Sequence, residues 1–198
     1  EILKLIKSKK CNKVIFAGNI IKPKISKLKL DLRGLFYIPR IVKASKLGDA
    51  AILKVLIKIL SENKIKVIKL NTFNPELTLK KGVYTKIKPN LLEKEEIAKG
   101  IRTLKKINSY NHTQAVIIRD NKVISRETRK GTKEMIKSVS KSKIKKGILI
   151  KLPKVKQDLR VDLPTIGIDT FKDCNKAGIK GIVVKAKQNI ILNKEISI

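Results

Sequence analysis

Residues 147–170 read GILIKLPKVKQDLRVDLPTIGIDT, a short apolar run followed by a dense polar cluster. The run Ile148, Leu149, Ile150, with Leu152 after Lys151, predicts a short buried strand, because brief apolar runs beside turn residues are typical of sheet cores. The polar residues that follow are Lys154, Lys156, Gln157, Asp158, Arg160, Asp162 and Thr165. A buried strand that leads into such a cluster is typical of a catalytic loop.

Two prolines stiffen this loop. Pro153 and Pro164 fix their own φ angles and favour extended geometry in the residues before them, which lowers the cost of ordering a site. Asp158 and Asp162 can hold a divalent cation through carboxylate oxygens, and Arg160 can bind a phosphate through its guanidinium fork. The residue types leave open a simpler interpretation, a solvated loop with a structural Asp–Arg pair.

The composition is that of a globular protein with an aliphatic core. Its 198 residues suffice for one large domain or two small ones, and 42% of them are apolar. Aromatic residues make up only 4%, which disfavours recognition of single-stranded nucleic acid by stacking.

The formal net charge of +32 indicates an anionic partner, either nucleic acid, an acidic lipid surface or a phosphorylated substrate. However, only seven of the 48 basic residues are Arg, the residue favoured for bidentate recognition, and the Lys residues are spread along the chain. We attribute most of the excess of Lys to compositional bias.

Cysteine use and hydropathy predict a cytoplasmic protein, at most peripheral on a membrane. Cys11 and Cys174 are too few for a disulfide framework or a zinc ribbon, and we expect both in the core. No apolar run reaches the length of a membrane span, and no signal segment is expected.

The first half of the chain predicts an α/β lobe over residues 1–84. A helical pattern at Ile2 precedes strand 13–20, so we expect a parallel sheet whose first strand lies upstream. Residues 20–38 are predicted as loop closed by Pro39. A helix from Asp49 as its cap to about Asn63 and a strand over 64–70 complete the lobe.

The second half predicts a mixed α+β lobe over residues 85–198, after a connection near 82–90. Asn90 is expected to cap a helix that runs to about Tyr110. Further expected elements are a hairpin over 113–119 and 122–127, helices 131–141 and 169–177, and strands 181–185 and 189–192. His112, the sole histidine, is interpreted as structural, with general base as the alternative.

Several motifs resemble one family in the same order along the chain. They are Phe16-Ala17-Gly18, Lys22-Pro23, Asp31-Leu32-Arg33-Gly34, Leu47-Gly48-Asp49, Gly82-Val83, Gly131-Thr132, Gln157-Asp158-Leu159-Arg160-Val161-Asp162-Leu163-Pro164-Thr165-Ile166-Gly167 and Gly178-Ile179-Lys180-Gly181-Ile182. Together they resemble the LpxI-type UDP-2,3-diacylglucosamine pyrophosphatases of lipid A biosynthesis. The resemblance implies an α/β fold of two small lobes, of which the N-terminal, Rossmann-like lobe lacks its first strand here.

The resemblance also implies an activity. It is the Mg²⁺-dependent hydrolysis of UDP-2,3-diacylglucosamine to UMP and 2,3-diacylglucosamine 1-phosphate (lipid X), with water attacking the phosphorus on the sugar side. Asp162 and Asp158 are the expected catalytic residues and, with Asp49, the metal ligands. The expected substrate-binding residues are Thr132, Lys151, Gln157, Arg160 and Thr165. The substrate implies work at the cytoplasmic face of the inner membrane; the oligomeric state stays open.

Two alternatives follow from departures in the sequence. Lys130 and Lys133 stand where the family is acidic around Gly131-Thr132, which is compatible with a catalytically inactive relative. The net charge by itself is compatible with a basic nucleic-acid-binding module, although no motif of that class is present. In the nucleic-acid-binding alternative, the loop with Asp158, Arg160 and Asp162 would have no role.

Overall fold

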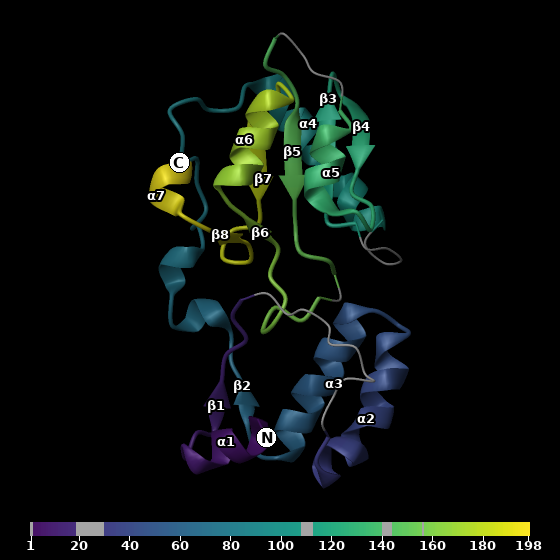
Figure 1. Cartoon of the computed structure of the whole chain (residues 1–198). Coiled ribbons are helices and arrows are strands. Elements are labelled where there is room, and N and C mark those ends of the chain that lie inside the picture. The colour runs from purple at the N-terminus through teal and green to yellow at the C-terminus, as the bar shows by residue number, and fades with distance from the viewer. Residues whose placement is uncertain (1, 19–29, 108–112, 140–143, 156) are drawn as a thin grey trace. The chain divides into compact units, whose positions relative to one another are not determined.

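The computed structural model describes residues 2–18, 30–107, 113–139, 144–155 and 157–198 (Figure 1). The fold is mixed α/β, as predicted. The chain forms two compact units: unit 1 is Glu1–Phe73 with Asp158–Asp162, and unit 2 is Asn74–Gln157 with Leu163–Ile198. The contacts thus group residues 74–84 with unit 2, and the proposed division at 84/85 stays a prediction. Lys22-Pro23 and His112 lie outside the described residues.

Unit 1 contains a two-stranded parallel sheet, β1 (Lys13–Val14) and β2 (Lys66–Val67). Parallel pairing agrees with the prediction, but each described strand is much shorter than the predicted one. Helices α1 (Ile2–Ser8) and α3 (Asp49–Glu62) accompany the pair. The core of the unit is a small aliphatic cluster built around Ile57, Leu60, Ile65 and Val67.

Helix α2 (Leu32–Ser45) corrects the prediction of a loop up to residue 38. Asp31 caps it, because the Asp31 carboxylate accepts a hydrogen bond from the Gly34 backbone N–H at 2.7 Å. Pro39 lies inside this helix instead of ending the loop. Proline removes only one backbone donor, and the packing of α2 along α3 offsets that loss.

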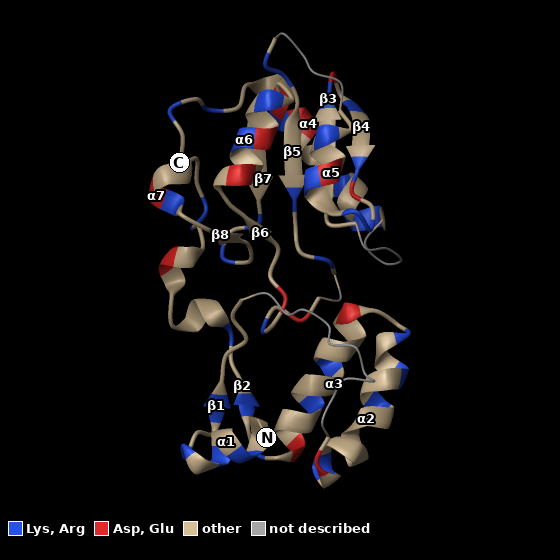
Figure 2. Cartoon of the chain, in the orientation of Figure 1, with Lys and Arg blue, Asp and Glu red and all other residues tan. Residues whose placement is uncertain are grey.

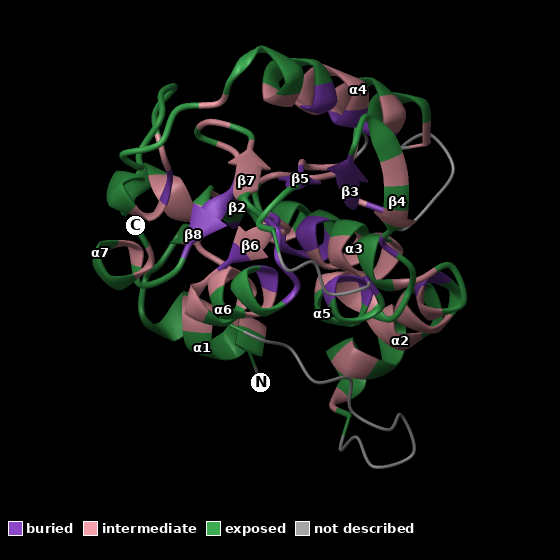
Figure 3. Cartoon of the chain, turned by 90° about the horizontal axis from the view of Figure 1, so that it is seen from above, coloured by how far each residue is buried: buried purple, intermediate pink, exposed green. Residues whose placement is uncertain are grey.

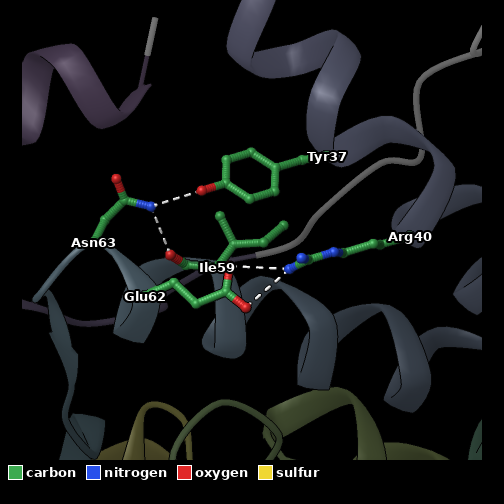
Figure 4. A network of polar contacts seen from close by, with 5 residues as sticks. All are labelled: Tyr37, Arg40, Ile59, Glu62 and Asn63. Carbon is green, nitrogen blue, oxygen red and sulfur yellow. Dashed lines mark hydrogen bonds and ion pairs between the residues drawn. The ribbon is translucent and has the colours of Figure 1, made fainter.

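A polar network joins α2 to α3 (Figure 4). Arg40 Nη1 donates to both carboxylate oxygens of Glu62, at 2.8 and 2.9 Å. Asn63, the residue that ends α3, donates through Nδ2 to the Tyr37 hydroxyl at 3.0 Å and to the Ile59 carbonyl at 2.9 Å. The two helices are therefore held at this end by side chains as well as by apolar packing.

Unit 2 contains a four-stranded sheet of order β4-β3-β5-β7. The strands are β3 (Ala115–Arg119), β4 (Lys122–Arg126), β5 (Ile148–Lys151) and β7 (Gly181–Val184). Strand β3 is antiparallel to both neighbours, and β5 is parallel to β7. The predicted hairpin is confirmed: Asp120 and Asn121 form its turn with positive φ angles. The buried strand predicted from Ile148 is confirmed as β5, every residue of which is buried.

Helices cover both faces of this sheet (Figure 3). Helix α4 (Leu91–Ile107) packs on one face, where Leu104 meets Ile118 and Ile150. Helices α5 (Gly131–Lys137) and α6 (Ile168–Lys176) pack on the other face. Gly100 brings α4 close to the sheet, since a Cβ atom there would lie 2.5 Å from Ile150 Cδ1.

The start of α4 confirms the predicted cap. Asn90 Oδ1 accepts a hydrogen bond from the Glu93 N–H, and the Asn90 N–H donates to Glu93 Oε2, both at 2.9 Å. Reciprocal bonds of this kind satisfy two backbone donors at the start of the helix. The helix begins at Leu91, one residue after the Asn90 cap.

Unit 2 also contains the parallel pair β6 (Thr165–Ile166) and β8 (Ile190–Ile191), helix α7 (Lys194–Ser197) and the 3-10 turn η3 (Pro75–Leu77). A further 3-10 turn, η2 (Leu70–Thr72), belongs to unit 1. Cys174 is buried as expected, whereas Cys11, also expected in the core, is exposed because it follows the turn that ends α1. In the described ranges, no helix is both long and apolar enough to cross a membrane.

Candidate functional site

A buried lysine ends strand β5. Lys151 is only 7% exposed, and its Nζ donates a hydrogen bond to the carbonyl of Thr165, in β6, at 2.9 Å. Burial lowers the pKa of Lys151 below its usual value, and the neighbouring Glu127 carboxylate partly opposes this shift. Lys151 and Thr165, both predicted to bind substrate, therefore lie together.

Glu127 organises the groups around this lysine. It is buried directly after β4, and its two carboxylate oxygens accept hydrogen bonds from the Thr132 hydroxyl at 2.5 Å and from the Gln114 N–H at 2.9 Å. Thr132, the third predicted substrate residue, is thereby held at the start of α5. Glu127 was not among the predicted residues; the available signal was a carboxylate between a strand and the Gly131-Thr132 turn in a chain with few acidic residues.

Two amides complete this group, which we call the Lys151 cluster (Gln114, Glu127, Thr132, Lys151, Thr165 and Asn189). Asn189 is 1% exposed, and its side chain joins the Lys151 carbonyl at 3.2 Å to the Lys185 N–H at 2.9 Å. Gln114 Oε1 is buried and has no hydrogen-bond partner among the residues described. An unsatisfied buried acceptor suits a donor on a bound ligand, such as a hydroxyl group.

The central part of the loop between Pro153 and Pro164 belongs to unit 1. The Asp158 carboxylate binds the Arg160 guanidinium, with Oδ1 2.9 Å from Nε and Oδ2 2.7 Å from Nη2. Oδ1 also accepts the Arg160 backbone N–H at 3.0 Å, and the Asp158 carbonyl accepts the N–H groups of Val161 and Asp162. Residues 158–162 therefore form a closed turn, which we call the Asp158 turn.

The electrostatics of the Asp158 turn follow from this pairing. The bond to Arg160 holds the pKa of Asp158 below its usual value, and the same bond raises the pKa of Arg160. Val161 packs against the aliphatic core of unit 1, which anchors the turn. The Arg160 side chain is 44% exposed and remains accessible to a ligand.

A small pocket of about 190 Å³ adjoins Arg160 within unit 1. Its lining residues are Ile57, Ser61, Lys64, Ile65, Lys66, Val67 and Arg160. The lining has three cationic side chains and no carboxylate, so its charge suits an anionic group such as a phosphate.

The other predicted residues have less specific surroundings. Gln157 Oε1 accepts the Lys154 N–H at 2.8 Å, which folds the loop back on itself in unit 2. Asp162 is half-buried at the end of the Asp158 turn. Asp49 is exposed in the first turn of α3; the cap of this helix is Gly48, so the predicted capping role of Asp49 is wrong.

Within the described ranges, no three His, Cys, Asp or Glu side chains gather closely enough to hold a metal ion. The assignment of Asp49, Asp158 and Asp162 as metal ligands stays a prediction. The structure brings together Thr132, Lys151 and Thr165 in unit 2, and Asp158 with Arg160 in unit 1.

Domains of one protein family together match nearly the whole chain. Residues 1–77 match the LpxI N-terminal domain, and residues 80–198 match the LpxI C-terminal domain. The UDP-2,3-diacylglucosamine pyrophosphatase LpxI of Caulobacter vibrioides is 29% identical over 203 residues, which cover 98% of this chain and 72% of that relative. These matches do not favour the nucleic-acid-binding alternative.

Proposed function

The chain belongs to the LpxI family, and on this basis we propose that it hydrolyses the pyrophosphate bond of UDP-2,3-diacylglucosamine in lipid A biosynthesis. The products would be UMP and 2,3-diacylglucosamine 1-phosphate. The observation that carries the proposal is the Lys151 cluster, in which the buried Lys151 ammonium bonds Thr165 and the neighbouring Glu127 holds Thr132. Because the substrate is lipid-linked, we also propose that the protein works at the cytoplasmic face of the inner membrane.

The Lys151 cluster supplies a preorganised phosphate site in this proposal. A desolvated ammonium interacts more strongly with a phosphate than a hydrated one, because the local dielectric is low. Thr132 and the unpartnered Gln114 Oε1 provide neighbouring polar groups for substrate oxygens and hydroxyls. Glu127 acts as a positioning residue that holds Thr132.

The Asp158 turn supplies the second set of groups. Asp158 holds the guanidinium of Arg160 through two of its nitrogens, so Arg160 would meet the substrate in a fixed orientation. A planar fork can bind two phosphoryl oxygens and stabilise the charge that develops on the bridging oxygen. We assign Asp158 to positioning of Arg160 as well as to its predicted catalytic role.

We propose Asp162 as the first carboxylate ligand of Mg²⁺. Proteins often bind this ion through one or two carboxylates together with substrate phosphates, so a cage of protein ligands is not required. Asp158 fits less well, since Arg160 occupies both of its oxygens. Bound Mg²⁺ would neutralise charge on the diphosphate.

The hydrolysis itself needs one water molecule. Its oxygen loses a proton to solvent and forms a bond to the phosphorus on the sugar side, while the bond from that phosphorus to the bridging oxygen breaks and UMP leaves with the bridging oxygen. In the proposal, Asp162 orients the water or the ion, and Arg160 meets the leaving oxygen. Lys151, Thr132 and Thr165, all in unit 2, remain predicted substrate-binding residues of that unit.

The test is the release of UMP and lipid X by the full chain and by its Asp162→Ala variant, with Mg²⁺ and with a chelator. We expect the variant to lose about a hundredfold or more in kcat, as is typical when a group that stabilises the transition state is removed. Asp120→Ala is a matched control, because Asp120 is an exposed, ion-paired Asp in a hairpin turn of unit 2. The absence of turnover by the unmodified chain would overturn the proposed function. Full activity of Asp162→Ala would overturn the role of Asp162.

A further inference from the structure

The connection between η3 and α4 exposes an unusual run of apolar side chains. Val83, Tyr84 and Ile87, followed by Leu91 and Leu92 in the first turn of α4, are all exposed, the last three by 69, 78 and 71%. We call residues 80–92 the exposed connection; Figure 3 shows its path to α4 largely in the colour of exposed residues. Single exposed apolar residues are ordinary, but five within ten residues indicate an interaction surface.

This connection is fixed at both ends. The Leu79 carbonyl accepts a hydrogen bond from the Lys187 N–H at 2.9 Å. At the other end, Asn90 and Glu93 form the reciprocal cap of α4, and Glu93 is ion-paired with Lys180 at 2.5 Å. The apolar side chains are thus presented by a tethered surface segment instead of a loose tail.

The charge of the exposed connection has one sign. Lys80 and Lys81 precede its apolar residues, and Lys86 and Lys88 flank Ile87; all four lysines are exposed, and residues 80–92 contain no Asp or Glu. Figure 2 shows the same pattern of blue and tan along this part of the chain. Apolar side chains between lysines are typical of segments that lie in the interface of an anionic membrane.

We infer that the exposed connection is the surface that docks this protein on an anionic phospholipid bilayer. Val83, Ile87, Leu91 and Leu92 enter the boundary between headgroups and acyl chains, and the four lysines contact lipid phosphates. A bilayer fits both features at once, since a purely electrostatic partner would not explain the apolar residues. The inference rests on the proposed function for its choice of lipid, because a diacylated substrate resides in a membrane.

The chain offers a closely matched pair of variants for the test. The first replaces Ile87, Leu91 and Leu92 with Ser. The control makes the same replacement at Ile2, Leu5 and Leu47, which are one Ile and two Leu in unit 1 that are 72, 60 and 77% exposed. Both variants keep the net charge of the protein, so any difference between them reports the position of the apolar residues and not the overall charge.

Binding would be measured by sedimentation with vesicles of phosphatidylglycerol and phosphatidylethanolamine, and with phosphatidylcholine vesicles. We expect the first variant to bind anionic vesicles about tenfold more weakly than the unmodified chain, and the control to bind normally. Equal losses in both variants, or none in either, would overturn the inference. So would strong binding to phosphatidylcholine, because the lysines would then have no role.

A second measurement reports insertion directly. The sequence has no Trp, so Ile87→Trp introduces a unique fluorophore in the exposed connection, and Leu47→Trp is its control. We expect brominated acyl chains in anionic vesicles to quench the fluorescence of Ile87→Trp and not that of Leu47→Trp. Equal quenching of both, or of neither, would contradict docking through this segment.

The test is separable from the proposed function. Turnover of the substrate in detergent micelles, which need no bilayer docking, should be normal in the variant that lacks Ile87, Leu91 and Leu92. If the unmodified chain binds vesicles as expected but has no turnover, the proposed function fails and the docking surface stands. If light scattering shows that the variant loses a dimer while its vesicle binding is unchanged, the surface is an interface between two copies and the inference fails.

Discussion

The Lys151 cluster and the Asp158 turn both place a carboxylate near a cation, but they do so in different solvent environments. In the first, Lys151 and Glu127 are each exposed by less than a tenth, and Glu127 holds Thr132 and the Gln114 backbone. In the second, Arg160 and Asp158 are partly exposed and bind each other directly. Burial thus orders the cation and the carboxylate in unit 2, whereas a local turn orders them in unit 1.

This difference assigns different tasks to the two groups. Buried groups are held in a fixed orientation. Loss of one partner destabilises the fold strongly, because the remaining buried group then has no hydrogen-bond partner. An exposed pair contributes little stability but leaves the cation accessible to a ligand. We therefore expect the Lys151 cluster to dominate stability and the Asp158 turn to dominate catalysis.

The largest expected effect of burial is the difference in reactivity between the two cysteine thiols. Burial raises the pKa of Cys174 to about 12, whereas Cys11 lies at the surface. Because the thiolate is the reactive form, we expect Cys11 to react with a disulfide reagent about a thousandfold faster than Cys174 in the folded protein. Mass spectrometry of the modified peptides would measure both rates, and the unfolded chain should show similar rates. Similar rates in the folded chain would contradict the burial of Cys174.

Replacement of Glu127 tests the buried cluster. In Glu127→Ala, the Thr132 hydroxyl and the Gln114 N–H lose their acceptor and Lys151 loses its nearby carboxylate, so we expect a loss of about 3 kcal/mol in the free energy of unfolding. Urea unfolding should show a lower midpoint with an unchanged slope. Glu134→Ala is the control, since it removes an exposed ion pair and should leave the free energy of unfolding nearly unchanged. Equal losses in the two variants would remove the distinction between buried and exposed carboxylates.

A Lys151→Met variant should show a smaller effect, with a characteristic dependence on pH. Because the pKa of Lys151 is lower in the folded than in the unfolded chain, charging this amine opposes folding at pH values below its folded pKa. The unmodified chain should therefore gain stability relative to Lys151→Met as pH rises toward 10.5, where the unfolded amine also loses its proton. Denaturant unfolding of both proteins between pH 7 and about pH 10 would measure this difference. A difference that does not change with pH would show that Lys151 is not desolvated.

Arg160→Ala should have the smallest effect on stability, about 1 kcal/mol or less, because the pair with Asp158 is partly exposed. The pKa of Asp158 is lowered in the folded chain, so the contribution of the pair is present above about pH 3.8 and is lost as pH falls through the folded pKa. Unfolding at pH 7 and at about pH 3 would measure it. The same variant should lose most of its turnover; a large loss of stability with normal turnover would reverse the tasks assigned to the two groups.

The sequence predicted those elements whose signals are local. Strand β5 follows from an uninterrupted apolar run, the cap of α4 from Asn90 and Glu93, and the hairpin from Asp120 and Asn121. Helix α2 was missed because Pro39 is a local signal for the end of a helix, while the packing along α3 that stabilises the helix is not local. Strand β6 is too short to leave a pattern, and its pairing partner β8 lies far along the chain.

The candidate site divides in the same way. By itself the sequence determined the family resemblance, the mixed α/β class and the concentration of polar residues between Pro153 and Pro164, because each depends on residue identity and spacing. Only the tertiary structure decided that Glu127 holds Thr132 beside the buried Lys151, and that the Asp158 turn packs with unit 1. Burial and long-range hydrogen bonds depend on which distant segments pack together, and no local pattern of residues encodes that choice.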